Sequence, residues 1–537
     1  MVSVFDQLRN MYADGLYGGS SLLSSFLITM SQNCPDVLNK SIDKYELLVY
    51  QGDSLMANCE YQKAEGIYHK ALQLHKSLPK NKENIYIMDD LCKKNMMDTD
   101  VKYKIYQCCY ALKNYQDAVA ILDTIPRSKK TVKMFYALAK GYDKLGMKSI
   151  AINMYKKVAE KHPLALDCVI SLIRLGEPSS TVINLFNTSF HHDLDWVHSF
   201  VKAHVFLHTK EYTKSLTAFE NITQKIMLKG NSDILCDAGI AASKAGDIKS
   251  AIKFFEALHL NDPQFLRGMD LYAYLLCEEE NFSELENLSN QLLSVSEVHP
   301  EPWVALGYYA KSNEDYTKAV YLAARASELD VNSVQALVLK GVSLRTLGEV
   351  HTAVTHIRQA LRKDPTRLDC HAELVRCYIQ QNRKAEAFNT AKKALDCVGL
   401  SADSLALCAG ALLADESYEK ATRLVEKALA IEPNHKPAIV VRCSIAQQQH
   451  LYSEAIERLQ KAVQCHSYST FHQMLGDCYF AINKYSDAVH HYHICLSLNS
   501  NTAEAKEGLE KINNVEHSGT FDADHHDAQP FSGSDWS

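Results

Sequence analysis

The chain is poor in residues that interrupt helices and in motifs that mark well-known catalytic sites. Its 537 residues include only 12 prolines and 21 glycines, too few for long flexible regions. It contains no phosphate-binding loop, no dinucleotide-binding G-x-G-x-x-G, no metalloprotease H-E-x-x-H and no hydrolase G-x-S-x-G motif. These absences favour a folded, non-catalytic protein and give no reason to expect a cofactor.

Other absences limit the partners that we expect. The formal net charge of -7 argues against a nucleic-acid-binding surface. The 16 cysteines include no C-x-x-C pair, so we expect reduced thiols buried in helices rather than disulfides or a metal site. The apolar stretch at residues 21–30 is too short and too rich in serine to span a bilayer. We therefore expect no nucleic acid and no membrane among the partners.

A 34-residue period organises residues 232–499. Its clearest marker is one small or apolar residue at a fixed position, namely Ala251, Leu285, Ala319, Ala353, Ala387, Ala421, Ala455 and, after 33 residues, Ala488. A second, mostly small residue lies 12 positions before each marker, as at Gly239 and Gly476. Small residues on consecutive helices let the two backbones approach closely, so each period predicts one antiparallel helix pair.

This spacing is typical of the tetratricopeptide repeat, and the expected helix boundaries agree with it. Prolines follow the marker by about 12 residues at Pro263, Pro365 and Pro433, where a proline ends one helix and can open the next. We therefore predict an all-α fold, a right-handed tetratricopeptide-repeat solenoid of about thirteen helix pairs.

The pattern divides the chain into four regions, which are residues 1–40, 41–231, 232–512 and 513–537. The first predicts two amphipathic helices joined at Gly18-Gly19, which either cap the first repeat or form a dimer surface. The second is an N-terminal array with an irregular, mobile loop at residues 77–100, and the third is the regular C-terminal array. The last is short of aliphatic residues, so we expect a disordered tail.

Two clusters of polar residues can be interpreted either as ordinary solvent-exposed side chains or as functional sites. His490 and His493 share a face of a predicted helix and would need a third ligand such as His472 to hold a metal ion. Exposed histidines are the interpretation that we favour, so we predict no metal site. The basic cluster at residues 127–133 follows Pro126 at a turn between repeats. A solvated loop explains it better than a nuclear signal.

The remaining candidates lie on the concave face, which the first helix of each pair lines in such arrays. The residues that we propose for a peptide groove are Arg345, Asp369, Arg376, Gln473 and Asp477. Arginines suit a terminal carboxylate and aspartates suit a guanidinium group, through charge-assisted hydrogen bonds. Chaperone-binding arrays use lysine and asparagine at groove positions five and nine, but the first repeat has Val49 and Asp53 there. A chaperone adaptor is therefore disfavoured.

Several segments carry a more specific resemblance than the period alone. They are residues 44–64, 101–126, 163–172, 194–209, 267–276, 301–307 and 332–348. These segments resemble subunit seven of the anaphase-promoting complex, or cyclosome. Because some of them lie in irregular repeats, the similarity is more specific than the generic repeat pattern, and it covers nearly the whole chain except the tail.

The resemblance implies a non-catalytic scaffold subunit of a multi-subunit E3 ubiquitin ligase that acts in cell division, in the nucleus and cytoplasm. Members of that family form homodimers through their N-terminal halves and stack on related tetratricopeptide subunits. Grooves in the family receive C-terminal Ile-Arg tails of coactivators. On this basis the apolar contacts of the dimer would be Leu22, Leu23, Phe26 and Leu27.

Two other classes of function stay open from the residues themselves. A generic tetratricopeptide adaptor of a transport or trafficking assembly would have the same fold and different partners. An accessory array of an enzyme is disfavoured, because the repeats leave no stretch long enough for a catalytic domain.

Overall fold

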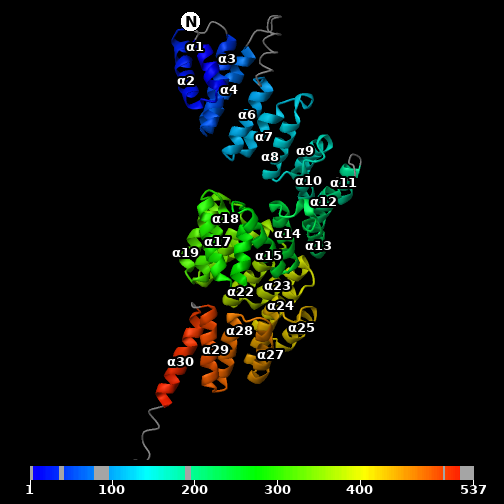
Figure 1. Cartoon of the computed structure of the whole chain (residues 1–537), viewed down its shortest axis with the longest axis vertical. Coiled ribbons are helices and arrows are strands. Elements are labelled where there is room, and N and C mark those ends of the chain that lie inside the picture. Colours follow the sequence, from blue (N-terminus) through cyan, green and yellow to red (C-terminus); the bar gives the residue numbers. More distant parts are fainter. Residues whose placement is uncertain (1–3, 35–40, 78–95, 188–194, 500–501, 520–537) are drawn as a thin grey trace, which may run out of the picture. The chain divides into compact units, whose positions relative to one another are not determined.

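The computed structural model describes residues 4–34, 41–77, 96–187, 195–499 and 502–519 (Figure 1). All regular elements within these ranges are helices. The chain divides into two compact units, Met1–Ile222 and Thr223–Ser537. The division falls slightly earlier than residue 231, after which the regular period begins in the sequence.

The first unit contains the N-terminal helices and the less regular repeats. Its helices are α1 (Val4–Ala13), α2 (Tyr17–Asn33), α3 (Ser41–Ala57), α4 (Tyr61–Ser77), α6 (Asp98–Ala111), α7 (Tyr115–Asp123), α8 (Val132–Lys144), α9 (Lys148–Lys161), α10 (Leu166–Leu175), α11 (Ser179–Asn187), α12 (Asp195–His208) and α13 (Tyr212–Thr223), with a 3-10 turn at Arg127–Lys129. The interval between α9 and α12 holds a short helix pair that turns at Gly176.

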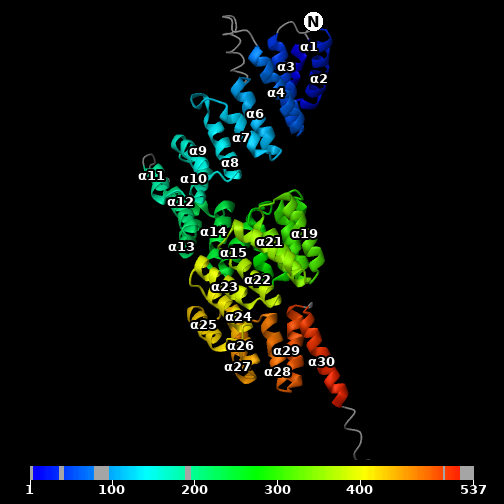
Figure 2. The same cartoon turned by 180° about the vertical axis from the view of Figure 1, so that it is seen from behind.

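The second unit contains the regular repeats. Its helices are α14 (Ser232–Ala245), α15 (Ile248–Asn261), α16 (Met269–Glu278), α17 (Phe282–Val295), α18 (Pro300–Ser312), α19 (Tyr316–Leu329), α20 (Val334–Thr346), α21 (Val350–Lys363), α22 (Leu368–Gln380), α23 (Lys384–Val398), α24 (Ala402–Ala414), α25 (Tyr418–Ile431), α26 (Lys436–Gln448), α27 (Tyr452–Cys465), α28 (Ser469–Ala481), α29 (Tyr485–Leu498) and α30 (Ala503–Gly519), with a 3-10 turn at Ile226–Leu228. Consecutive helices lie side by side when the unit is seen from behind (Figure 2).

The all-α tetratricopeptide fold and the predicted number of helix pairs are confirmed. Among the described residues, thirteen pairs run from α3–α4 to α28–α29, preceded by α1 and α2 and followed by α30. No helix in these ranges combines the length and the apolar character needed to cross a bilayer.

A tight turn joins the two helices of each regular repeat. One residue of the turn has a left-handed backbone, namely Gly246, Glu280, Glu314, Gly348, Asn382, Glu416, His450 and Asn483, with φ between 57° and 88°. The next amide closes the turn by donating to a carbonyl five residues earlier, as from Asn281 to Leu276 at 2.9 Å. This turn sets the antiparallel direction of the second helix.

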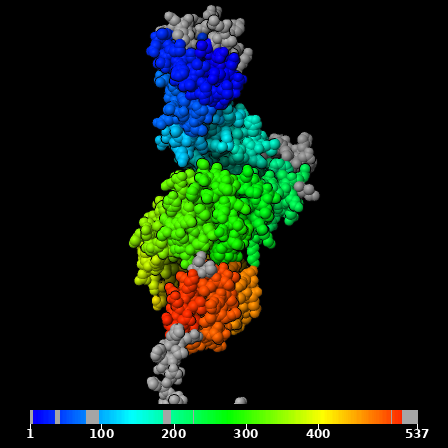
Figure 3. All heavy atoms as spheres, turned by 60° about the vertical axis from the view of Figure 1, so that its left-hand side comes forward, coloured from blue at the N-terminus to red at the C-terminus, as the bar shows by residue number. Residues whose placement is uncertain are grey.

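Close backbone approach holds each pair together. A Cβ atom added at Gly239 would lie 2.8 Å from the Phe255 ring, and one added at Gly476 would lie 2.5 Å from the Tyr492 ring. The marker alanines, such as Ala319, are fully buried. Figure 3 shows side chains filling the spaces between the green helices of the second unit on the face that is turned forward.

Two predicted boundaries differ from those of the structure. The first two helices join at Asp14–Leu16, and Gly18-Gly19 lies inside α2, so the predicted turn was wrong. Residues 513–519, which were assigned to the predicted tail, continue α30 as helix, and Ile512 just before them is buried in the core. Residues 520–537, and residues 78–95 of the predicted loop, lie outside the described ranges.

Replacing Gly476 by alanine tests the close approach. The Tyr492 ring is held between α28 and α30, where a Cβ at Gly476 or Gly508 would lie 2.5 Å from it. We expect the variant Gly476→Ala to lower the stability of the C-terminal repeats by about 1–3 kcal/mol through overpacking. Urea denaturation followed by circular dichroism measures the change.

The matched control is Gly410→Ala, where the nearest side-chain atom would lie 3.8 Å away. Alanine in an open helical position should be neutral or stabilising by about 0.5–1 kcal/mol. Equal effects of the two substitutions would contradict the packing argument.

Candidate interaction surfaces

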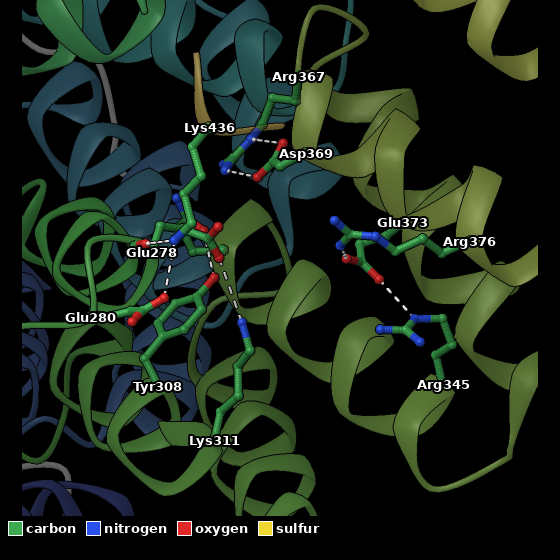
Figure 4. A network of polar contacts seen from close by, with 11 residues as sticks. Glu278, Glu280, Tyr308, Lys311, Arg345, Arg367, Asp369, Glu373, Arg376 and Lys436 are labelled. Carbon is green, nitrogen blue, oxygen red and sulfur yellow. Dashed lines mark hydrogen bonds and ion pairs between the residues drawn. The ribbon is translucent and has the colours of Figure 1, made fainter. Parts of the chain in front are cut away.

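The first helices of consecutive repeats in the second unit bring charged residues together (Figure 4). Lys311 of α18 lies 3.7 Å from the carboxylate of Glu278 at the end of α16. The Tyr308 hydroxyl, one turn before Lys311, lies 3.0 Å from the Gln335 amide of α20. Tyr308 and Lys311 are three residues apart and therefore share one face of α18. The repeat period places the first helices of neighbouring repeats beside that face, so these side chains line one surface.

Glu373 of α22 is the centre of one cluster. Arg345 Nε of α20 donates to its carboxylate at 2.9 Å, and Arg376, one turn further along α22, makes an ion pair with the other oxygen. Burial alone would raise the pKa of Glu373, but the charges of Arg376 and Arg345 outweigh it and lower that pKa. Glu373 is 7% exposed whereas Arg376 is 60% exposed, so the cluster presents the side chain of Arg376 to solvent.

Asp369 belongs to a second cluster. The Arg367 guanidinium binds its carboxylate through two nitrogens, and the Nε contact measures 3.1 Å. In the orientation that gives both ends of the Gln335 amide a partner, its oxygen accepts from Arg367 at 3.0 Å and its nitrogen donates to Tyr308. Both charged side chains are about 15% exposed, because they are packed among the lining helices.

Gln473 and Asp477 lie together on α28, four residues apart. The Asp477 carboxylate accepts a hydrogen bond of 2.6 Å from the Tyr492 hydroxyl of its own repeat. The structure thus places the five predicted groove residues in three groups. Arg345 and Arg376 meet at Glu373, Asp369 is paired with Arg367, and Gln473 and Asp477 form a separate site.

The four residues predicted as dimer contacts occupy two sides of α2. Leu22 is 60% exposed and Phe26 is 57% exposed, and Met30 continues this stripe at 49%. By contrast, Leu27 is 3% exposed and Leu23 packs against the core of the first unit. Leu23 and Leu27 therefore stabilise the fold of their own chain, because the helix turns them inward.

Polar contacts that the sequence did not reveal fix α1 to the first repeat. The Arg9 guanidinium donates to the Glu46 carboxylate of α3 at 2.9 Å. The Tyr12 hydroxyl donates to Asp53 at 2.7 Å, and Lys104 of α6 contacts the same carboxylate at 2.7 Å. The only sequence signal was Asp53 at a groove position of α3.

The histidine and lysine clusters are explained by contacts within the chain. His472 Nδ1 lies 3.1 Å from His491 Nδ1, so the pairing differs from the one considered from sequence. The described part of the chain contains no group of three residues able to hold a metal ion. In the basic cluster, Lys130 contacts Asp123 at 2.9 Å and Lys133 lies 3.6 Å from Asp100.

Family models match two parts of the chain. A model described as anaphase-promoting complex, cyclosome, subunit 3 matches residues 312–394. A model described as tetratricopeptide repeat matches residues 134–165. The first match covers the helices that carry the Glu373 cluster, and the second covers α8 and α9 of the first unit.

Curated relatives match almost the whole chain. Anaphase-promoting complex subunit 7 of Mus musculus is 37% identical over 527 residues, which cover 96% of this chain and 92% of the relative. The Homo sapiens protein of the same name is 36% identical with the same coverage. The Arabidopsis thaliana protein of that name is 25% identical and covers 94% of this chain and 93% of its own length.

A solved structure has the same fold. The crystal structure of the APC/C hetero-tetramer Cut9-Hcn1 contains a chain that matches with a TM-score of 0.58, covering 95% of this chain and 96% of that one. Sequence identity is 16%, so the likeness supports the tetratricopeptide architecture alone.

Removing the central carboxylate tests the Glu373 cluster. In the variant Glu373→Gln the two guanidinium groups lose their shared counter-charge, and we expect a loss of about 1–3 kcal/mol in the free energy of unfolding. In the control Glu386→Gln, the lost pair with Arg383 is about half exposed and should contribute less than about 1 kcal/mol. Urea denaturation of both variants measures the difference.

The effect should depend on pH in a defined direction. Because the pKa of Glu373 is lowered in the folded state, its contribution is present above its unfolded pKa of about 4.3. It is lost as the pH falls through the lower folded pKa. The stability difference between the parent chain and Glu373→Gln should therefore shrink below about pH 4, and a constant difference down to more acidic pH would contradict the pairing.

Proposed function

The chain belongs to the anaphase-promoting complex subunit 7 family, and from this premise we propose that it is a non-catalytic scaffold subunit of that E3 ubiquitin ligase. The observation that carries the proposal is similarity along the whole array, including the irregular repeats. The proposed role is positional: the chain holds other tetratricopeptide subunits during cell division, in the nucleus and cytoplasm.

The architecture suits that role. Thirteen helix pairs offer extended surfaces that are already folded before a partner arrives. Binding to such a surface orders few additional groups and so has a low entropic cost. Repeats also let one chain contact several partners at different positions along its length.

Affinity purification of the tagged full-length chain from dividing cells tests this proposal. We expect other tetratricopeptide subunits of the ligase to co-purify in amounts similar to the chain itself. Recovery of a transport or trafficking assembly without those subunits would favour the alternative adaptor function and contradict the proposal.

We also propose that two copies associate through the N-terminal helices. The exposed stripe of Leu22, Phe26 and Met30 repeats every four residues along α2 and so lies on one helix face. On the other side of α2, Leu27 is buried and Leu23 packs against the core of the first unit, so α2 itself is held on its own chain. The stripe is therefore presented by an anchored element, and burying it against a second copy would remove it from water.

The double variant Leu22→Glu, Phe26→Glu tests the dimer. Charges on this face should oppose its burial, so we expect light scattering to give half the mass of the parent chain. Leu260→Glu is the control, because Leu260 is 75% exposed on another helix. A parent chain that is monomeric, or a double variant that stays dimeric, would contradict the proposal. Point variants are preferable to deletion of residues 1–40, which also removes Arg9 and Tyr12.

The Glu373 cluster supports a second, finer proposal, that the concave surface binds the C-terminal Ile-Arg tail of a coactivator. Arg345 and Arg376 share one carboxylate, so one positive charge is left to meet a terminal carboxylate. Asp369 is already paired with Arg367 and is a poorer partner for the arginine of the tail. Glu278, which is 47% exposed beside Lys311, is better placed for that role.

Reversing the charge of Arg376 tests the tail site. We expect Arg376→Glu to weaken binding of a synthetic peptide ending in Ile-Arg by about 1–3 kcal/mol, the range for a lost charged hydrogen bond. The control is Arg325→Glu, which changes an arginine that is 48% exposed on a second helix of a repeat. Fluorescence anisotropy measures both affinities, and equal affinity in the two variants would remove Arg376 from the site.

A further inference from the structure

Turns that are far apart in the sequence touch one another within the second unit. Lys436 Nζ lies 3.1 Å from Glu280 and the Tyr468 hydroxyl lies 3.1 Å from Glu279. These contacts join residues 156 and 189 positions apart. They bring the turn between α16 and α17 to the N-terminal ends of α26 and α28, which belong to repeats near the end of the array.

Two further contacts join early and late repeats in the same way, and we call this set of contacts the seam. Lys249, at the start of α15, lies 2.9 Å from His466, which follows α27. Lys244, near the end of α14, lies 3.6 Å from Asp364 in the turn before α22. In each contact, residues in or beside the turn of an early repeat meet residues at a junction between later repeats, so the seam consists of several contacts and is not a single crossing.

Glu280 also binds the N-terminus of α28. Its second carboxylate oxygen accepts a hydrogen bond of 2.9 Å from the backbone amide of Ser469, the first residue of α28. That amide has no partner within its own helix, and the residue before the helix, Tyr468, gives no side-chain cap. A carboxylate at a helix N-terminus is also favoured by the helix dipole. Glu280 therefore caps α28 from a distant repeat.

Lys436 completes the arrangement. Its ammonium group lies 4.0 Å from the centre of the Tyr468 ring, a cation–π contact. The same group contacts Glu280, whose side chain is 16% exposed. The side chains of Lys436, Tyr468, Glu279 and Glu280 thus form one connected network of polar contacts. Figure 4 shows Lys436 and Glu280 of this network at its left.

The period supplies an internal comparison. Glu314 lies 34 residues after Glu280, at the same position of the next turn, with φ of 60° against 61°. Glu314 is exposed, whereas Glu280 is largely covered. The chemistry and backbone of the two positions are alike, so their difference comes from what the later repeats bring to Glu280.

We infer that Glu279 and Glu280 form a latch with Lys436, Tyr468 and the α28 N-terminus that closes the repeats from α16 to α28 on themselves. Each junction between repeats contributes a small rotation, and these rotations add along an array. A contact between distant repeats fixes their sum. The latch therefore sets how open the concave surface of the second unit is, whatever partner that surface binds.

Hydrogen–deuterium exchange on the full-length chain tests the latch, with Glu280→Ala as the variant and Glu314→Ala as the matched control. We expect the amides of residues 469–472 to exchange at least tenfold faster in Glu280→Ala and to be unchanged in Glu314→Ala. Small-angle scattering should also give a larger maximum dimension for Glu280→Ala only.

Circular dichroism checks that both variants keep their helices, since each substitution changes a turn residue that lies between two helices. Unchanged exchange at residues 469–472 in Glu280→Ala would overturn the inference. Equal acceleration in Glu314→Ala would do so as well, because the effect would then belong to the turn and not to the distant contact. Failure of the scaffold or tail proposals would leave these results unaffected.

Discussion

Close approach of the two helices within each repeat is the constraint on which the rest of the structure depends. At Gly476 a single added carbon would lie 2.5 Å from the Tyr492 ring, and at Gly341 it would lie 2.5 Å from Ile357. Such distances are shorter than van der Waals contact, so the first helix must have a small residue there. The large side chain from the second helix then fills the space. Because the arrangement recurs every 34 residues, each pair presents its first helix in a similar place.

That regularity explains how residues spaced along the chain come to share one surface. Lys311, Arg345 and Arg376 lie on three successive first helices and gather around Glu278 and Glu373. Three positive side chains surround two carboxylates, so the surface carries one excess positive charge and is already held by ion pairs before any partner binds. Most charges of this cluster are already paired within the chain, which differs from a groove lined by unpaired charges. Arg376 has the most exposed side chain of the cluster.

The sequence predicted the parts of the structure that follow from the period. The helix pairs and the tetratricopeptide fold both follow from local spacing. Contacts that depend on where distant repeats meet were not predictable. Glu280 and Glu314 look alike in the sequence, yet only the fold brings Lys436 and Ser469 to Glu280. Likewise, Leu23 and Leu27 resemble Leu22 and Phe26 in hydrophobicity, and their inward direction depends on how α2 packs.

A scaffold function requires that the array contact other subunits directly, and cross-linking mass spectrometry on the purified ligase containing this chain measures that most directly. We expect cross-links from lysines of both units to other tetratricopeptide subunits, together with links between two copies near the N-terminal helices. A chain that co-purifies but forms cross-links to no other tetratricopeptide subunit would contradict a scaffold function.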